Sequence, residues 1–440
     1  MNYKGLSNRS NWGNRTIATL GVVVAGLTFA ETGPSYEVPP DQTPSELAAP
    51  ALVSGSNFHV VDPVRSDGLM HRYVIESHFG TFEAYGQSQL TVRVHEVSAL
   101  TELAKTSNVE VAVGGVANGV TSQVNTVVGV ATHPVQTVTG IPKGIAHLFH
   151  GYADRGKELL ADAKHDREPS EPGADKGSDV ASKGGDAATR YAARYFGVSS
   201  AERRWYQKLG VDPYTDNAIL RAAIHKAARV DAAAGFGMKF VGIPGVPGVG
   251  LMSKATDAIY NEDPATIRAR TRGTLAGYGL TLEEIEHWQN KLILSPTRQV
   301  LLLAAAEALG GVEGRGELFR HAISLRAPEE AQVYLQSVGL LVMAHRQNPV
   351  QSILPGVRLP AAKRADGHII VCGAFESVYW TADVAKGESQ IREALPTEGI
   401  AARELVLSGT TSERARTELV ALGWTVRESQ ISSAPDTGSK

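Results

Sequence analysis

The sequence predicts an α+β protein that is predominantly helical, and three observations predict this class. Short β-rich runs separated by turn residues come first, capped helical patterns fill the middle, and strands alternate with helices near the end. These predict a small N-terminal antiparallel sheet with helices, a central multi-helix region and a small C-terminal α/β (βαβ) unit. Because the only cysteine is Cys372, no disulfide can form within the chain, and packing alone must hold the fold.

Residues 1–30 are typical of a cleavable secretory signal peptide. Lys4, Arg9 and Arg15 make a positive start, an uncharged and mostly apolar run follows, and the small residue Ala30 precedes a predicted cut before Glu31. A membrane anchor is the alternative, but it needs about 20 apolar residues, and this run is shorter. A lipoprotein is excluded because no cysteine stands at the cut. We therefore expect a periplasmic protein without a second transmembrane span.

Residues 31–66 are rich in proline and predict an extended tether. Residues 67–163 are expected to hold the small antiparallel sheet plus amphipathic helices. The predicted strands are residues 72–76, 81–85 and 89–97, because β-rich runs alternate there with turn residues. A short helix is expected over residues 98–104.

Residues 111–142 carry no charged side chain, and their apolar residues recur at helical spacing. One face holds Val116, Val120 and Val124, and the opposite face holds Asn118 and Ser122. Such a helix either packs on the preceding sheet or contacts a partner. The partner would be an envelope protein or a membrane surface, reached through residues 111–160. Interfacial helices usually carry Lys or Arg, which this tract lacks, so packing is the favoured interpretation.

Residues 164–189 are polar and rich in glycine and proline, and they predict a disordered linker. Residues 190–350 then predict a helical domain of six to eight helices. Its start signals are Asp263 before a proline, a capping box of Thr281 and Glu284, Ser295 before a proline, and Pro328.

Residues 351–428 predict an α/β domain. Residues 368–372, 377–380 and 404–407 resemble strands, and residues 381–395 resemble a helix. Thr410 and Glu413 are expected to begin a second helix that ends at Gly423, before a returning strand at Trp424. This pattern is a βαβ unit of minimal size. Residues 429–440 are a polar tail.

No stretch carries a standard catalytic motif, whether a phosphate-binding loop, a dinucleotide fingerprint, a zinc-protease helix, a nucleophile elbow or a CxxC pair. The net charge of −3 gives no electrostatic footprint for nucleic acid. We therefore assign no catalytic residue, no cofactor-binding residue, no metal ligand and no cofactor. Whether the protein is an enzyme, and its oligomeric state, stay undecided, because acid/base pairs built from distant residues leave no local pattern.

Four groups of residues are weak candidates for chemistry. His147 and His150 share a helical face but lack a third metal ligand. Residues 212–216 gather two carboxylates, and capping by Thr215 or Asp216 explains them. Cys372 and His368 share one strand face yet lie about 13 Å apart. The run Arg203, Arg204 and Lys208, with Trp205 and Tyr206, mixes basic and aromatic residues as a nucleic-acid or headgroup site would, and a solvated face explains it more simply.

Several phrases together resemble a group of uncharacterised exported proteins of Gram-negative bacteria. The phrases are residues 90–103 (LTVRVHEVSALTEL), 132–142 (THPVQTVTGIP), 209–216 (LGVDPYTD) and 294–299 (LSPTRQ). The similarity spans about residues 68–427. It implies the envelope compartment and one architecture, and it implies no activity or ligand.

Two functional hypotheses follow. The first and favoured one is a periplasmic structural or protein-interaction protein of the bacterial envelope, with residues 111–160 as the candidate contact for an envelope protein or a membrane surface. The second is an exported hydrolase-type enzyme with a site between the helical and C-terminal α/β parts. A cleft there that gathered several of His287, His321 and His345 with acidic residues would favour the enzyme.

Overall fold

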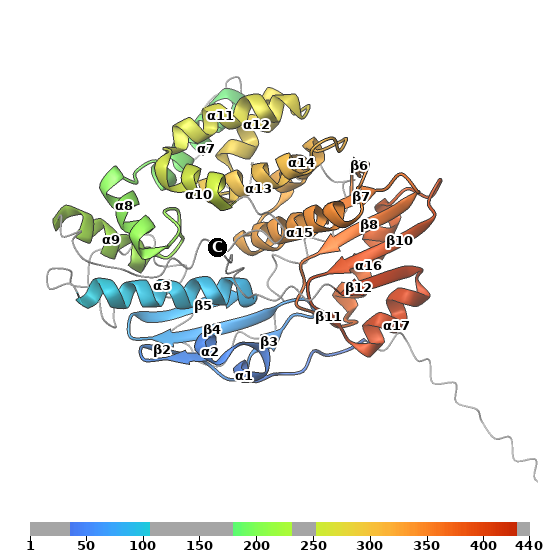
Figure 1. Ribbon diagram of the computed structural model, residues 1–440, viewed down its shortest axis with the longest axis horizontal. Coiled ribbons are helices and arrows are strands. Elements are labelled where there is room, and N and C mark those ends of the chain that lie inside the picture. The colour runs from blue at the N-terminus through green and yellow to red at the C-terminus, as the bar shows by residue number, and fades with distance from the viewer. Residues whose placement is uncertain (1–35, 106–178, 231–251, 429–440) are drawn as a thin grey trace, which may run out of the picture. The chain divides into compact units, whose positions relative to one another are not determined.

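The computed structural model describes residues 36–105, 179–230 and 252–428, all within one compact unit (Figure 1). The predicted signal peptide at residues 1–30, the tract at 111–160 and the polar tail at 429–440 lie outside the described residues. Mixed α+β architecture is confirmed, because an antiparallel N-terminal sheet, a helical middle and a C-terminal mixed sheet follow one another along the chain.

The N-terminal sheet has the strand order β1-β2-β4-β3, and β5 also pairs with β4. Its strands are β1 (Ser54–Gly55), β2 (Phe58–Val60), β3 (Arg65–Ser66), β4 (His71–Ser77) and β5 (Gly80–Tyr85). The hairpin of β4 and β5 is the one that the sequence predicts. The predicted tether at 31–66 is wrong for residues 36–66, which form α1 (Pro44–Leu47), α2 (Pro50–Val53) and the first three strands. Proline begins each of these short helices, where its missing N–H costs nothing.

The third predicted strand, residues 89–97, is wrong, because these residues belong to helix α3 (Gln87–Lys105). Its β-branched residues favour a strand locally, yet Leu90, Val94 and Val97 also recur at helical spacing and are buried. The expected helix at 98–104 is the second half of α3. In Figure 1, α3 lies along β4 and β5, and it contacts both strands.

The middle of the chain is helical, as predicted, with nine helices in the described parts of residues 179–347, one more than the upper expectation. They are α7 (Asp179–Tyr195), α8 (Ser200–Leu209), α9 (Ala218–Val230), α10 (Met252–Asn261), α11 (Pro264–Gly277), α12 (Leu282–Asn290), α13 (Pro296–Ala308), α14 (Gly316–Ser324) and α15 (Pro328–Gln347). Helix α7 corrects the predicted linker over residues 179–189. The caps at Asp263, Thr281 and Ser295 are confirmed, since each side chain accepts a backbone N–H.

The C-terminal sheet has the order β12-β10-β8-β7-β6, and β8, β10 and β12 are parallel. Its strands are β6 (Ser352–Ile353), β7 (Ala361–Lys363), β8 (His368–Gly373), β10 (Ala402–Leu407) and β12 (Trp424–Glu428). Helices α16 (Ala382–Ala394) and α17 (Glu413–Ala421) are the crossovers, and β9 (Ser377–Val378) pairs with β11 (Thr410–Thr411). The βαβ unit is confirmed. Its second helix is capped by Ser412 rather than by the expected Thr410, which pairs in β11 instead.

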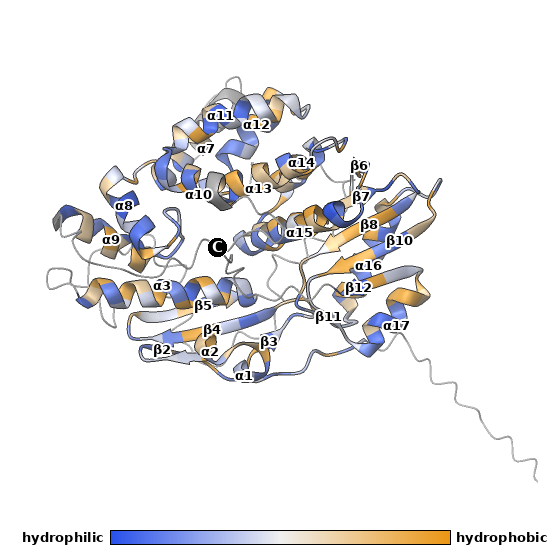
Figure 2. Cartoon of the chain, viewed as in Figure 1, coloured by the Kyte–Doolittle hydropathy of each residue, from blue (hydrophilic) through white to orange (hydrophobic). Residues whose placement is uncertain are grey.

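One hydrophobic core joins these parts. It runs from Leu69 and Val97 at the N-terminal layer, through the central helices, to Cys372 and Trp424 in the C-terminal sheet. Figure 2 shows β8 as a mainly hydrophobic strand, and α15 packs against it. Within the described residues, no helix has the length and apolar character that crossing a bilayer requires.

Candidate functional site

A buried polar network surrounds the middle of α3. Glu96 is 1% exposed, and its carboxylate accepts hydrogen bonds from Arg93 Nη1 (2.8 Å), Asn217 Nδ2 (3.0 Å) and the Thr215 hydroxyl. Arg93 also donates from Nη2 to Asp216 Oδ1 over 2.7 Å. Burial alone would lower the pKa of Arg93, but the carboxylates of Glu96 and Asp216 raise it above its ordinary value. The network, defined as these five residues, thus pairs one guanidinium with two carboxylates, and the neutral Thr215 and Asn217 side chains donate to Glu96. Asp216 lies at its solvent-exposed edge, with a side chain that is 51% exposed.

Asp212 lies beside this network and connects it to Thr297 in helix α13. Its Oδ1 accepts from the Thr297 hydroxyl (2.6 Å) and from the backbone N–H of Tyr214 (2.9 Å). Burial raises the pKa of Asp212 to about 6, despite these hydrogen bonds.

Three of the four phrases on which the predicted family resemblance rests meet here. The phrase at 90–103 supplies Glu96, the phrase at 209–216 supplies Asp212, and the phrase at 294–299 supplies Thr297. The fourth phrase, residues 132–142, lies outside the described residues.

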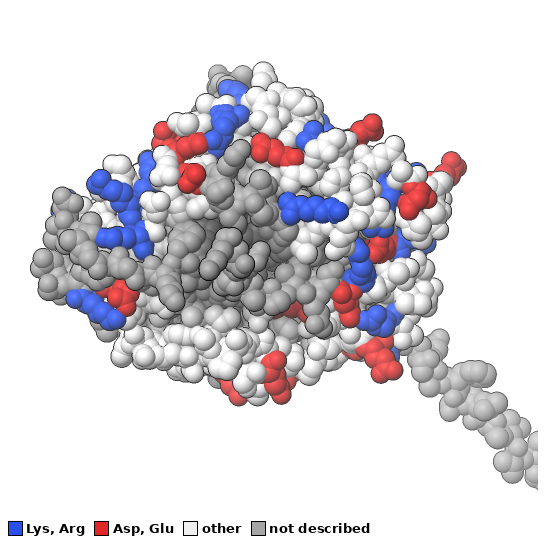
Figure 3. Space-filling model, viewed as in Figure 1, with Lys and Arg blue, Asp and Glu red and all other residues white. Residues whose placement is uncertain are grey.

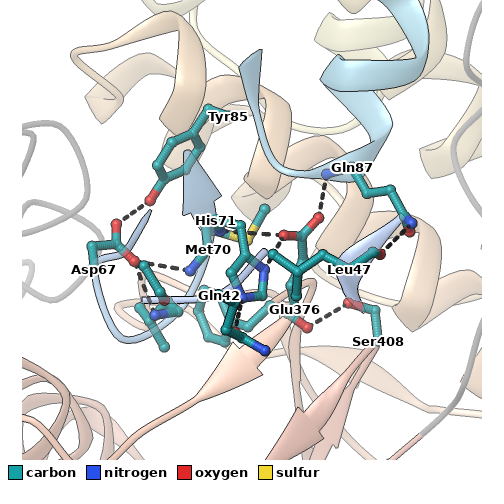
Figure 4. Close-up of polar contacts among 12 residues, drawn as sticks. Gln42, Leu47, Asp67, Met70, His71, Tyr85, Gln87, Glu376 and Ser408 are labelled. Carbon is teal, nitrogen blue, oxygen red and sulfur yellow. Dashed lines mark hydrogen bonds and ion pairs between the residues drawn. The ribbon is translucent and has the colours of Figure 1, made fainter. Parts of the chain in front are cut away.

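A second cluster holds the N-terminal end of α3, and we call it the α3 clasp: Gln42, His71, Gln87 and Glu376 (Figure 4). Glu376 follows β8, 289 positions after Gln87 in the sequence. Its carboxylate accepts from the backbone N–H of Gln87, the first residue of α3, and hydrogen-bonds Nδ1 of His71 over 2.8 Å. A carboxylate at this end of a helix also meets the positive pole of the helix dipole.

The backbone strengthens the same contact. The amide N–H of Glu376 donates to the carbonyl of Leu69 (2.9 Å), and that of Tyr379 donates to the carbonyl of Gly68 (2.9 Å). Gly86 has φ +80°, and a Cβ there would lie 2.5 Å from Met70 Cε and 3.0 Å from Glu376 Oε1. Only glycine lets the chain turn into α3 this close to the clasp.

Asp67 and Tyr85 form a further pair beside the clasp (Figure 4). The Tyr85 hydroxyl donates to Asp67 Oδ2, and Asp67 Oδ1 accepts from the amides of Leu69 (2.9 Å) and Met70 (2.8 Å). Burial, and then the charge of Asp67, raise the pKa of Tyr85 well above its ordinary value, so the phenol stays protonated. This pair fixes the loop that the C-terminal part binds.

The His71–Glu376 pair has the form of a catalytic histidine held by a carboxylate, but its other nitrogen is already engaged. Nε2 of His71 hydrogen-bonds the Gln42 side chain over 3.1 Å, and His71 is 3% exposed. The nearby Ser408 hydroxyl donates to the carbonyl of Phe375 (2.8 Å) rather than to His71. A nucleophile bonded to the histidine, which acyl transfer needs, is not present among the described residues. The arrangement can join segments, and we find no reaction that it performs.

The structure places each sequence candidate. Of residues 212–216, Thr215 and Asp216 belong to the network and Asp212 lies beside it. The Thr215 hydroxyl accepts the backbone N–H of Asn217 (3.1 Å), but the cap of α9 is Asn217 rather than Thr215 or Asp216, because Asn217 Oδ1 accepts from the N–H of Leu220 (3.0 Å). Cys372 is fully buried in β8, and burial raises the pKa of its thiol to about 12. His368 contacts Asp366 instead (3.0 Å). His147 and His150 lie outside the described residues.

The basic and aromatic residues of α8 separate into two faces. Trp205 and Tyr206 are each 3% exposed and belong to the core, whereas Arg204 is exposed to solvent. The aromatic rings therefore take no part in a surface site, which leaves the basic side chains alone there.

The junction of the helical and C-terminal parts holds a small hollow with a cavity volume of about 10 Å³, roughly the space of one water molecule. His321 and Glu317 line it, and His287 and His345 do not. His345 instead accepts the backbone N–H of Val350 at Nδ1 (3.1 Å). Small-molecule sites are clefts of about 300–1,000 Å³, so this hollow is far below that range.

Within the described residues, no group of three or more His, Cys, Asp or Glu side chains could hold a metal ion. Sequence reasoning missed Arg93, Glu96, His71 and Glu376 as members of a cluster. The only sequence signal for Arg93 and Glu96 was that they stand in one of the phrases on which the predicted family resemblance rests. His71 and Glu376 had no such signal.

No family model matches this chain, and neither a curated protein nor a solved structure shows significant similarity to it.

Proposed function

We propose that this chain is a structural or protein-interaction protein of the bacterial envelope, located in the periplasm and related to the exported family named above. The observation that carries the proposal is how the described carboxylates are used. Glu96, Asp212 and Glu376 bind other segments of the same chain, where an enzyme would direct such groups into a cleft. These carboxylates are therefore suited to stabilise a fold that presents a binding surface, rather than to catalyse a reaction.

We propose that the partner binds residues 111–160, which follow α3 in the sequence. Because α3 is fixed at Gln87 by the clasp and at Arg93 by the network, this segment begins from a firmly held helix. Its uncharged tract is suited to an apolar partner surface.

Site-specific photo-crosslinking in living cells tests the proposal. A photoreactive residue at Val116, Val120 or Val124 should give one discrete adduct, whereas the same residue at Asn118 or Ser122 should give little. Equal labelling of both faces, or none at either, would contradict a specific contact. Fusion of residues 1–30 to a reporter enzyme that is active only outside the cytoplasm tests the compartment, and an inactive fusion would refute it.

An exported hydrolase remains the second candidate, and the hollow lined by Glu317 and His321 is the observation that favours it. If it were the enzyme's site, ester or amide hydrolysis by the purified chain would fall when His321 becomes Ala. We expect no hydrolysis above background in either protein.

A further inference from the structure

The described chain begins with an extended segment that reaches a distant part of the fold. We call residues 36–40 the N-terminal strap, and Figure 1 shows it within the blue segment that runs from α1 to α17. The backbone N–H of Glu37 donates to the carbonyl of Trp380 (2.9 Å), 343 positions later in the sequence. The neighbouring side chains of Tyr36 and Val38 are 46% and 89% exposed. Glu37 therefore points toward the fold while its two neighbours point outward, as along an extended backbone.

The carboxylate of Glu37 binds where two crossover helices of the C-terminal sheet begin. Its Oε2 accepts from the backbone N–H of Trp380 and from the Ser412 hydroxyl (2.6 Å). Trp380 directly precedes Thr381, the N-cap of α16, and Ser412 is the N-cap of α17. We call these two donors, together with the Trp380 carbonyl, the carboxylate receptor. The helix dipole also stabilises a negative group at such helix N-termini.

Contacts that do not involve the strap hold the carboxylate receptor in place. The N–H of Ser412 donates to the Val378 carbonyl (2.9 Å), and the Ser412 hydroxyl oxygen accepts the N–H of Ala415 (3.0 Å). On the other side of the receptor, the N–H of Tyr379 donates to the Gly68 carbonyl (2.9 Å). Departure of the strap would therefore leave the receptor formed, with its donors able to bind another carboxylate.

The strap itself is held by few contacts. Among the described residues, its hydrogen bonds to the rest of the fold are the three of Glu37, and the next ones along the chain join Gln42 to Val64. Pro39 and Pro40 lack the N–H that further backbone pairing would need. No strap residue belongs to a hydrophobic cluster of the described chain. The strap can thus leave the receptor without disturbing the core.

Neutral donors, rather than a cation, recognise the carboxylate. Glu37 forms no ion pair with any residue that the structure describes, because the arginines of α17 pair with other carboxylates. Arg414 pairs with Glu418 (3.2 Å). Arg416 pairs with Glu428. Figure 3 shows acidic and basic side chains interspersed over the C-terminal part, at the right of the view. The receptor therefore selects a carboxylate by directed hydrogen bonds, and long-range attraction contributes little.

We propose that the carboxylate receptor is a binding site for a glutamate in an extended segment of a partner protein, and that the strap occupies it in cis until such a segment displaces it. The two donors bind the carboxylate, while the Trp380 carbonyl binds the backbone N–H of the same residue. The site therefore fits an extended acidic peptide better than a free anion. The inference rests on the proposed interaction function, but its site is separate from residues 111–160.

Fluorescence anisotropy of a labelled, N-acetylated peptide with the sequence of residues 36–40 (YEVPP) tests the inference on the full chain. Glu37→Ala vacates the receptor, so this variant should bind the peptide at least about 10-fold more tightly than wild type, in which the strap leaves only a small fraction of receptors free. Asp41→Ala is the matched control. It removes an acidic residue that lies beside Arg65 (3.9 Å) rather than in the receptor, so it should bind like wild type.

Two further comparisons in the Glu37→Ala background identify the groups that bind. A peptide with Gln in place of Glu should bind about 10-fold more weakly, because hydrogen bonds to a charged acceptor are stronger than those to a neutral one. Adding Ser412→Ala should weaken binding of the original peptide about 10-fold, whereas Ser412→Thr keeps the hydroxyl and should not. Circular dichroism checks that each variant is folded.

Equal binding of the Glu and Gln peptides would overturn the inference, and so would the absence of saturable binding to Glu37→Ala up to about 10 mM peptide. Competition by acetate as effective as that by unlabelled peptide would show a site for any small anion instead. A dimer that forms in wild type and not in Glu37→Ala, measured by sedimentation equilibrium, would show that the strap is exchanged between two copies and not held in cis. Crosslinking at Val120 probes residues 111–160, so its failure leaves the peptide result unchanged.

Discussion

Asp212 gives the sharpest test of how the buried polar groups are used. Its carboxylate accepts two hydrogen bonds inside the fold, and burial raises its pKa from 3.8 to about 6. A group whose folded pKa is raised stabilises the fold below its unfolded pKa, and this stability is lost as pH rises through the folded pKa. Acidification from about pH 8 to about pH 5 should therefore increase the free energy of unfolding by at most about 1.4 kcal/mol, because Asp212 is only partly buried.

The substitution Asp212→Asn should remove this increment. The amide resembles the protonated carboxyl, so its oxygen can still accept from Thr297 and from the Tyr214 N–H. Urea unfolding of wild type and variant across this pH range measures the difference, with the exposed Asp257→Asn as the matched control. The reasoning is refuted if Asp212→Asn keeps the wild-type pH dependence, or if it is several kcal/mol less stable at pH 8.

Three further predictions concern stability and reactivity. Glu96→Ala should lower the free energy of unfolding by about 3–5 kcal/mol in urea titration, because it leaves Arg93 buried beside one carboxylate fewer; a loss under 1 kcal/mol would contradict the described network. Gly86→Ala should lower the melting temperature, since its Cβ would meet Met70 and Glu376, whereas Gly197→Ala, with no atom within 4 Å, should not. The thiol of Cys372 should react with a thiol reagent only after unfolding, and fast reaction of the native chain would show that β8 is less buried than described.

Local signals predicted the fold class and most of the central and C-terminal elements. Asp263, Thr281 and Ser295 are caps because a side-chain oxygen reaches an N–H two or three residues away, and such contacts are written in a short window of sequence. The βαβ unit is local for the same reason, since each strand and helix follows the last by a short turn.

The wrong predictions arose where contacts between residues far apart in the sequence decide the structure. Residues 89–97 contain β-branched side chains at both strand and helix spacing, and the helix forms where Leu90 and Val94 pack on the sheet. The N-terminus of α3 is held by Glu376, which no window around Gln87 contains. The candidate site was equally hidden, because Glu96, Asp212 and Thr297 are far apart in sequence and meet only in the fold.

The central claim is that these carboxylates hold distant parts of the chain together, and hydrogen exchange of Glu376→Ala tests it most directly. Charge-assisted hydrogen bonds contribute about 1.5–3 kcal/mol, so amide exchange at Gln87, His71 and the first turn of α3 should become about 10–100-fold faster. Exchange in α12, which lies outside the clasp, should be unchanged, as should the whole pattern in the exposed Glu398→Ala control. Unchanged protection at Gln87 and His71 in Glu376→Ala would contradict the claim.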